Sequence, residues 1–147
     1  MTDKTIDALN DVTKTLIDSQ KGYQKAAEIT ADDHAVLSAE FSRRSAERLN
    51  LVGRFQQQVV SMGGEPQDDG GMAGSAHRAW TDFSSMFTSD ADAALEAIDD
   101  GEDHLAEAIE KKLEDEDVAV AVRPLLQEAL ASAREGERFA DRLEELR

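Results

Sequence analysis

The stretch of residues 98–113, IDDGEDHLAEAIEKKL, constrains the fold most strongly, because its apolar residues recur with the period of a helix. The only step too long for one helical face, from Ile98 to Leu105, is bridged by Glu102. The sequence therefore predicts an amphipathic helix that turns an acidic side chain toward the core. The apolar positions of this face are Leu95, Ile98, Leu105, Ile109 and Leu113.

A histidine, His104, follows Glu102 by two residues. On a helix of 3.6 residues per turn this spacing corresponds to about 200° of rotation, so the two side chains face different sides. We therefore do not expect them to bind the same metal ion.

Two further amphipathic helices are predicted in the first half of the chain. Over residues 4–29 the apolar steps of three and four leave one gap, which falls on Gln20. The next helix has a cap-like start at Thr30 and runs to about residue 62, where Gly63 and the residues after it end it. On its inner face Arg44 and Arg48 occupy turns where a plain bundle would place leucines.

The segment of residues 63–89 is too long for a turn between neighbouring helices. Its start is rich in glycine and acid, and its second half has a helical pattern that includes Trp80, Phe83 and Phe87. We predict a crossover along the bundle that carries a short extra helix, with these aromatic residues packed on the bundle.

The last two helices are predicted around the acidic turn of residues 114–117, EDED. Ser89, with Asp92 three residues later, can cap the third helix, which ends near Leu113. The fourth helix should begin near Val120, because Pro124 is tolerated only in the first turn.

Four long helices in two hairpins, joined by one long crossover, predict an all-α, ferritin-like four-helix bundle. We expect one domain over residues 1–147. The two halves also echo each other, because residues 19–28 (SQKGYQKAAE) align without a gap with residues 101–110 (GEDHLAEAIE), so that Gln20 matches Glu102.

Charge and composition exclude several classes of function. Lys and Arg total 16 against 32 Asp and Glu, and the net charge of −16 argues against binding nucleic acid or an anionic membrane surface. The acidic residues are expected on solvated helix faces, or in a patch that recruits cations or a basic partner. There is no cysteine for a thiolate metal site, and no apolar run is long enough to span a membrane. We expect a soluble, cytoplasmic protein.

Four segments carry a family resemblance: QKGYQKAAE, GGEP, GSAHRAW and DGEDHLAEAIEKKL. In their order and spacing they resemble the bacterial ferritin-like four-helix-bundle proteins of unassigned function, which are distant relatives of the rubrerythrins. The resemblance implies a ferritin-like fold and no settled activity. Members of this family often have an acid where this chain has Gln20.

A ferritin-like di-iron site needs one Glu from each of two helices and a Glu-x-x-His from each of the other two. Glu102 could supply one carboxylate, but its counterpart in the first helix is Gln20, and no Glu-x-x-His occurs in the chain. The histidines are expected at a helix start, in the crossover and off the core face: His34, His77 and His104. The nearest patterns in the second and fourth helices are Glu47-x-x-Asn50 and Glu135-x-x-Arg138.

A buried carboxylate costs several kcal/mol unless it is paired, and the second helix offers two arginines. We predict that Glu102 pairs with Arg48 or Arg44, and that Gln20 and Ser132 complete the hydrogen bonds of a buried polar layer. No catalytic, cofactor-binding or metal-binding residue is predicted.

The sequence favours a non-catalytic bundle with a binding or stress-associated structural role. An exposed bundle face or the crossover helix could serve for a homodimer. The alternative is a divergent di-iron carboxylate protein, an iron-binding oxidase or peroxidase, and iron is expected as a cofactor only in that case.

Overall fold

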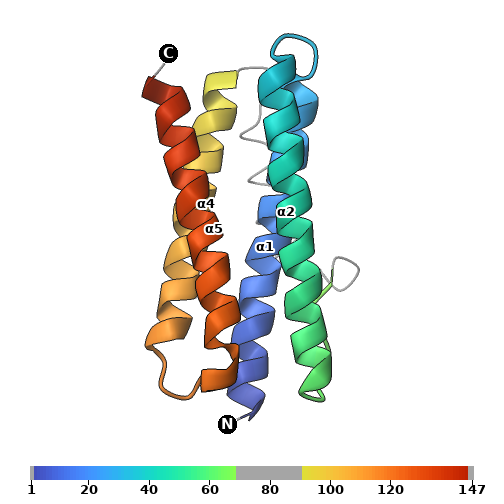
Figure 1. Ribbon diagram of the computed structural model, residues 1–147, viewed down its shortest axis with the longest axis vertical. Helices are drawn as coiled ribbons and strands as arrows, with labels where there is room; N and C mark the ends of the chain where they lie inside the picture. Colours follow the sequence, from blue (N-terminus) through green and yellow to red (C-terminus); the bar gives the residue numbers. More distant parts are fainter. Residues whose placement is uncertain (1, 69–90, 146–147) are drawn as a thin grey trace.

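The computed structural model describes residues 2–68 and 91–145, and these residues form a bundle of four long helices (Figure 1). No strand occurs in the part of the chain described, so the all-α prediction is confirmed there. The predicted extra helix with Trp80, and with it His77, lies outside the described residues. The elements are α1 (Thr2–Thr30), α2 (Ala35–Ser61), α4 (Ala91–Glu114), the short 3₁₀ turn η1 (Val120–Val122) and α5 (Arg123–Glu145).

The helices form two antiparallel pairs (Figure 1). α1 packs against α2, α4 packs against α5, and α1 also packs against α4. α2 ends beside the N-terminus of the chain, whereas α4 begins at the opposite end of the bundle. None of the described helices is long and apolar enough to cross a membrane.

The predicted cap at Thr30 is wrong. α1 continues to Thr30, whose hydroxyl donates to the carbonyl of Ala26 (2.8 Å), one turn earlier. A threonine inside a helix commonly bonds back to the preceding turn in this way and is then not available to cap the next helix. α2 begins instead after His34, whose side chain makes no capping bond.

The predicted end of α2 and the predicted start of the last helix agree with the structure, whereas the predicted cap at Ser89 lies outside the described residues. α2 ends before Gly63, which has a φ of +83°, a conformation that glycine adopts without steric cost. Its amide donates to the carbonyl of Val60 (3.0 Å). Pro124 lies in the first turn of α5, directly after η1, as its missing N–H predicts.

The core consists of two apolar clusters. One lies toward the N-terminal end of α1 and includes Leu16, Leu51 and Leu105. The other includes Tyr23 and Phe41 and lies toward the opposite end of the bundle, where α1 ends and α2 begins. Between the two clusters lie the buried side chains of Arg48 in α2 and Glu102 in α4, and these form the centre of the candidate site.

Candidate functional site

A salt bridge between α2 and α4 lies at the centre of the bundle. Arg48 and Glu102 are each 1% exposed. Nη1 of Arg48 lies 2.5 Å from Oε1 of Glu102, and Nη2 lies 2.5 Å from Oε2. The guanidinium therefore binds both oxygens of the carboxylate, which is the strongest geometry for this pair of groups.

Two serines, one from each of the other two helices, accept the remaining hydrogen bonds of Arg48. Its Nε donates to Oγ of Ser132 (3.1 Å), Nη2 donates to the carbonyl of Ser132 (3.0 Å), and Nη1 donates to Oγ of Ser19 (2.6 Å). With the two bonds to Glu102, these make five bonds for the five N–H groups of a guanidinium. The charge is thus buried without an unsatisfied donor, and all four helices take part.

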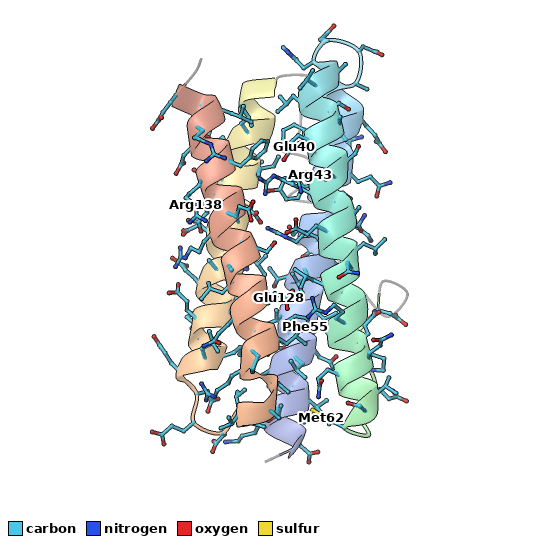
Figure 2. All side chains as sticks on the ribbon, in the orientation of Figure 1. Glu40, Arg43, Phe55, Met62, Glu128 and Arg138 are labelled. Atoms are coloured by element: carbon cyan, nitrogen blue, oxygen red, sulfur yellow. The ribbon has the colours of Figure 1, made fainter. Side chains whose placement is uncertain are left out.

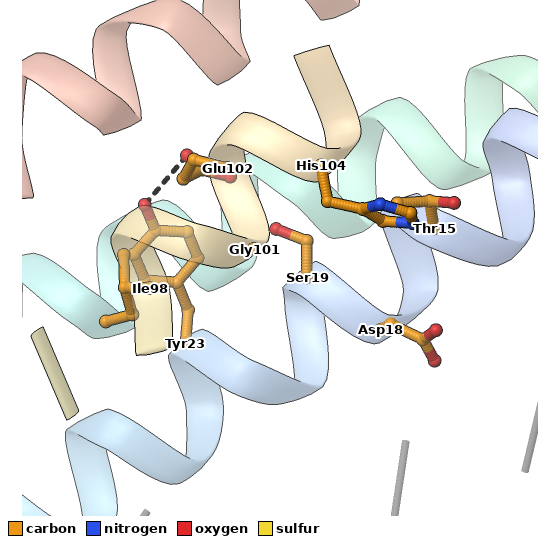
Figure 3. A pocket seen from close by; sticks show the side chains of 8 residues that line it. All are labelled: Thr15, Asp18, Ser19, Tyr23, Ile98, Gly101, Glu102 and His104. Atoms are coloured by element: carbon orange, nitrogen blue, oxygen red, sulfur yellow. Dashed lines mark hydrogen bonds between the residues drawn. The ribbon is translucent and has the colours of Figure 1, made fainter. Parts of the chain in front are cut away.

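Tyr23 of α1 makes the remaining contact with the carboxylate. Its hydroxyl donates to Oε2 of Glu102 over 2.9 Å (Figure 3). Burial, followed by the negative charge of Glu102, raises the pKa of Tyr23 well above its ordinary value. The hydroxyl therefore keeps its proton and acts as a hydrogen-bond donor.

The charge state of the arginine is also fixed by its surroundings. Burial lowers the pKa of Arg48, but the charge and the hydrogen bonds of Glu102 outweigh this effect and raise it above the ordinary value. The pair is accordingly an ion pair. Such a pair tolerates the loss of neither partner, because the remaining charge would be buried without compensation.

A glycine of α5 makes room for the carboxylate. A Cβ atom placed on Gly136 would overlap Oε2 of Glu102, and it would lie 2.6 Å from Cδ of Glu102 and 2.9 Å from the hydroxyl oxygen of Tyr23. Real Cβ contacts do not occur at such distances. The position of Glu102 therefore requires glycine at residue 136.

Two of the five residues predicted for the polar layer lie outside this network. The amide of Gln20 donates to Oγ of Ser45 (3.1 Å) and to Gln24, because Gln20 faces the seam between α1 and α2. Arg44 is buried but pairs with Glu40 (Nε to Oε1, 3.3 Å), and its guanidinium lies 4.3 Å from the ring centre of Phe139. Arg48, Glu102 and Ser132 are brought together.

Two residues that contact the pair of Arg48 and Glu102 were not predicted from the sequence: Ser19 and Gly136. Ser19 lies one turn before Tyr23 on the same face of α1, a spacing that could have pointed to it. Gly136 lies in the middle of a helix, where glycine costs about 1 kcal/mol relative to alanine, and this cost is a sign of close packing.

The residues present do not fit a ferritin-type metal pair. Both oxygens of Glu102 are bound by Arg48. Glu47 accepts a hydrogen bond from Ser132 (2.6 Å), and the side chain of Glu135 is 56% exposed at the surface, 4.0 Å from Nη2 of Arg44. Two positively charged guanidinium groups thus lie where carboxylate and imidazole ligands would be needed.

Among the described residues, the only group of three acidic or histidine side chains close enough to share a cation lies elsewhere. It consists of Asp99, Asp141 and Glu144, on the outside of the α4 and α5 pair. His34 and His104 are exposed, and neither belongs to such a group within the described residues. Exposed charged side chains of both signs cover the outer faces of the bundle; Arg43 and Arg138 are two of the basic ones (Figure 2).

One side of the network opens into a cavity of about 130 Å³ between α1 and α4 (Figure 3). Ser19, Tyr23 and Glu102 line its inner part. Thr15, Asp18 and His104 also line it.

Over the residues that the structure describes, the fold and the site define a class of protein: an all-α bundle of four long helices with a buried arginine–glutamate pair in which every guanidinium N–H has a partner. Residues 4–115 match the family described as "Domain of unknown function (DUF2383)", and the chain belongs to this family. The match includes nearly all of α1 and the whole of α2 and α4, with Arg48 and Glu102, and leaves α5 outside. No curated protein and no solved structure matches the chain.

Proposed function

We propose that this protein is a non-catalytic, ferritin-like four-helix bundle that serves as a binding or structural protein. In this proposal the pair of Arg48 and Glu102 takes the place of a metal centre and ties the four helices together. The observation that carries it is the bidentate contact of Arg48 with Glu102, in which every guanidinium N–H has a partner.

The direction of the helices supports the ferritin-like part of the proposal. α2 ends at one end of the bundle and α4 begins at the other, so the two helices run parallel (Figure 1). A simple up-down-up-down bundle would join antiparallel neighbours by a short turn. A third long helix that begins at the end of the bundle opposite the end of the second is typical of ferritin-like folds.

Electrostatics support the non-catalytic part. A metal pair at Glu102 would lie next to the positive charge of Arg48, which is 1% exposed and poorly screened by solvent. To admit a metal, Arg48 would have to leave five hydrogen bonds and find new partners within an apolar core. The ion pair is therefore the more stable occupant of this position.

The proposal is tested by metal analysis of the protein purified under iron supplementation, together with oxygen-dependent oxidation of ferrous iron. We expect no stoichiometric iron and no oxidation above the level of free iron in buffer. Glu102→Ala and Glu107→Ala serve as a matched pair, because both remove a carboxylate from α4 but Glu107 is exposed. Stoichiometric iron that is lost in Glu102→Ala and kept in Glu107→Ala would overturn the proposal.

A further inference from the structure

We propose that the outward face of α2 binds a second copy of this chain, with the two α2 helices antiparallel across a two-fold axis. This inference goes beyond the proposed function, because it concerns the side of α2 that points away from Arg48 and Glu102.

An uncharged stripe runs along the outside of α2. Its residues follow one another at steps of three and four, so they share one face of the helix, and this face is turned away from buried positions such as Arg48 and Phe55. Two of its side chains, Leu49 and Val60, are 57% and 58% exposed. The stripe consists of Ala35, Ala39, Ser42, Ala46, Leu49, Gly53, Gln57 and Val60.

The absence of charge distinguishes this stripe from the outer faces of other long helices. The chain has a net charge of −16, and 33% of its residues are charged. α1 exposes Asp7 and Asp11 one turn apart, and α5 exposes Glu128 and Glu135 two turns apart. Two copies of so acidic a chain repel each other where charged faces meet. The α2 stripe allows two copies to meet without bringing like charges together, and it offers no opposite charge to a basic partner.

Gly53 supports a close contact on this face. It lies in the middle of α2, where glycine makes a helix less stable than alanine does. A Cβ atom on Gly136 would overlap Glu102, whereas a Cβ atom on Gly53 would meet no heavy atom within 4 Å in the described part of the chain. Packing within this part therefore does not require Gly53. A glycine inside a helix suits the close approach of another backbone, which here would come from the second copy.

The stripe complements itself when two copies run antiparallel. With the two-fold axis between positions 47 and 48, the leucine and the valine of one copy each face an alanine of the other. A parallel pair in register would instead place Leu49 against Leu49 and Gly53 against Gly53, which leaves uneven gaps. The facing pairs of the antiparallel arrangement are Ala35 with Val60, Ser42 with Gly53, and Ala46 with Leu49.

The area of the stripe predicts a weak dimer. α2 has 27 residues, so it is about 40 Å long, and a helix is about 10 Å wide. Two such faces together bury roughly 800 Å², less than the roughly 1,200 Å² at the lower limit of stable specific interfaces. We therefore expect monomers and dimers to exchange, with the dimer forming at high protein concentration.

Sedimentation equilibrium of the full chain over a concentration series tests the proposal. The mass should rise from that of a monomer to that of a dimer. Ala46→Arg should weaken the dimer at least tenfold, because it places a long charged side chain where Leu49 of the second copy packs. Ala131→Arg adds the same side chain at an exposed position of α5 and should leave the dimer unchanged. Both variants make the net charge less negative, so a general charge effect would strengthen association in both.

Introduced cysteines test the antiparallel arrangement, since the natural chain has none. A mixture of Ala35→Cys chains and Val60→Cys chains should form a disulfide between copies under mild oxidation. Ala35→Cys alone should not, because positions 35 and 60 are separated by 25 residues of α2, or about 37 Å, and the two thiols would lie at opposite ends of the interface.

Gly53→Ala separates a role in the interface from a role in the fold. It should raise the melting temperature of the dilute monomer by a few degrees, because alanine favours the helix and the added Cβ has room. The same replacement should weaken the dimer, because the added Cβ would lie against the second copy.

Each contrary result overturns the inference. These results are a monomer even at millimolar concentration, equal weakening in Ala46→Arg and Ala131→Arg, cross-linking of Ala35→Cys alone, no cross-linking of the mixture, and an unchanged dimer in Gly53→Ala. If Ala46→Arg fails to fold, the cross-linking of the cysteine variants decides. None of these measurements depends on bound iron, so their failure is separate from failure of the proposed function.

Discussion

The replacement Arg48→Met tests how the buried pair contributes to stability. It removes the charge and the five hydrogen bonds while keeping a side chain of similar length. Glu102 is then left 1% exposed without a positive partner. Breaking a buried ion pair in this way typically costs about 3–5 kcal/mol, far more than the pair contributes relative to an apolar replacement.

The chain contains a matched control for this experiment. Arg54 of α2 also binds both oxygens of a glutamate, Glu128 of α5, at 2.7 Å and 2.6 Å. The two side chains are 41% and 53% exposed, so solvent screens the pair. Arg54→Met should therefore cost at most about 1 kcal/mol. The two replacements share the residue types and the bidentate geometry and differ in burial.

Denaturant unfolding and thermal unfolding, both followed by circular dichroism, measure the two effects as a free energy and as a melting temperature. In a chain of this size about 1 kcal/mol shifts the melting temperature by roughly 2–4 °C, so Arg48→Met should lower it by roughly 10 °C. The double replacement Arg48→Met with Glu102→Leu should recover most of the loss, because neither charge of the pair then remains in the core. Equal costs for Arg48→Met and Arg54→Met, or no recovery in the double variant, would refute the reasoning.

Three further predictions follow from the same structure. Gly136→Ala should lower stability by about 2 kcal/mol or more, since its Cβ would overlap the carboxylate of Glu102; a loss below about 0.5 kcal/mol on denaturant unfolding would contradict the close approach. Tyr23→Phe should cost about 1–2 kcal/mol by removing one donor to that carboxylate, and an unchanged unfolding midpoint would count against the bond. Burial, followed by repulsion from Asp141, raises the pKa of Asp99 to about 6. The ionised form of Asp99 therefore destabilises the fold, and the loss grows as pH rises through 6. Asp99→Asn should raise the melting temperature by a few degrees at pH 8 and not at pH 4, and a difference that does not change with pH would contradict this assignment.

The helices themselves were predictable from sequence, because apolar steps of three and four report which face is buried. The same pattern predicted that Glu102 turns inward, since it interrupts a stripe of buried residues. The pattern does not show whether Arg44 or Arg48 pairs with Glu102, because the two arginines lie one turn apart on the same face of α2. That choice depends on the relative height of α2 and α4, which a single helix does not encode.

Contacts between helices were harder to predict than the faces of each helix. The role of Gly136 depends on how closely α5 approaches Glu102, and this distance is a property of the packed bundle. Gln20 was expected beside the pair because it matches Glu102 between the two halves. In the structure Gln20 contacts Ser45 instead, and Ser19 and Tyr23 reach the pair.

The most direct test of the central claim is the side-chain nuclear magnetic resonance signal of the Arg48 guanidinium during anaerobic titration with ferrous iron. If the ion pair occupies the centre of the bundle, its N–H signals exchange slowly with water and stay unchanged when one equivalent of iron is added. Glu102→Gln should weaken this protection. Stoichiometric loss of the Arg48 signals by paramagnetic broadening would place iron beside Glu102 and contradict the account.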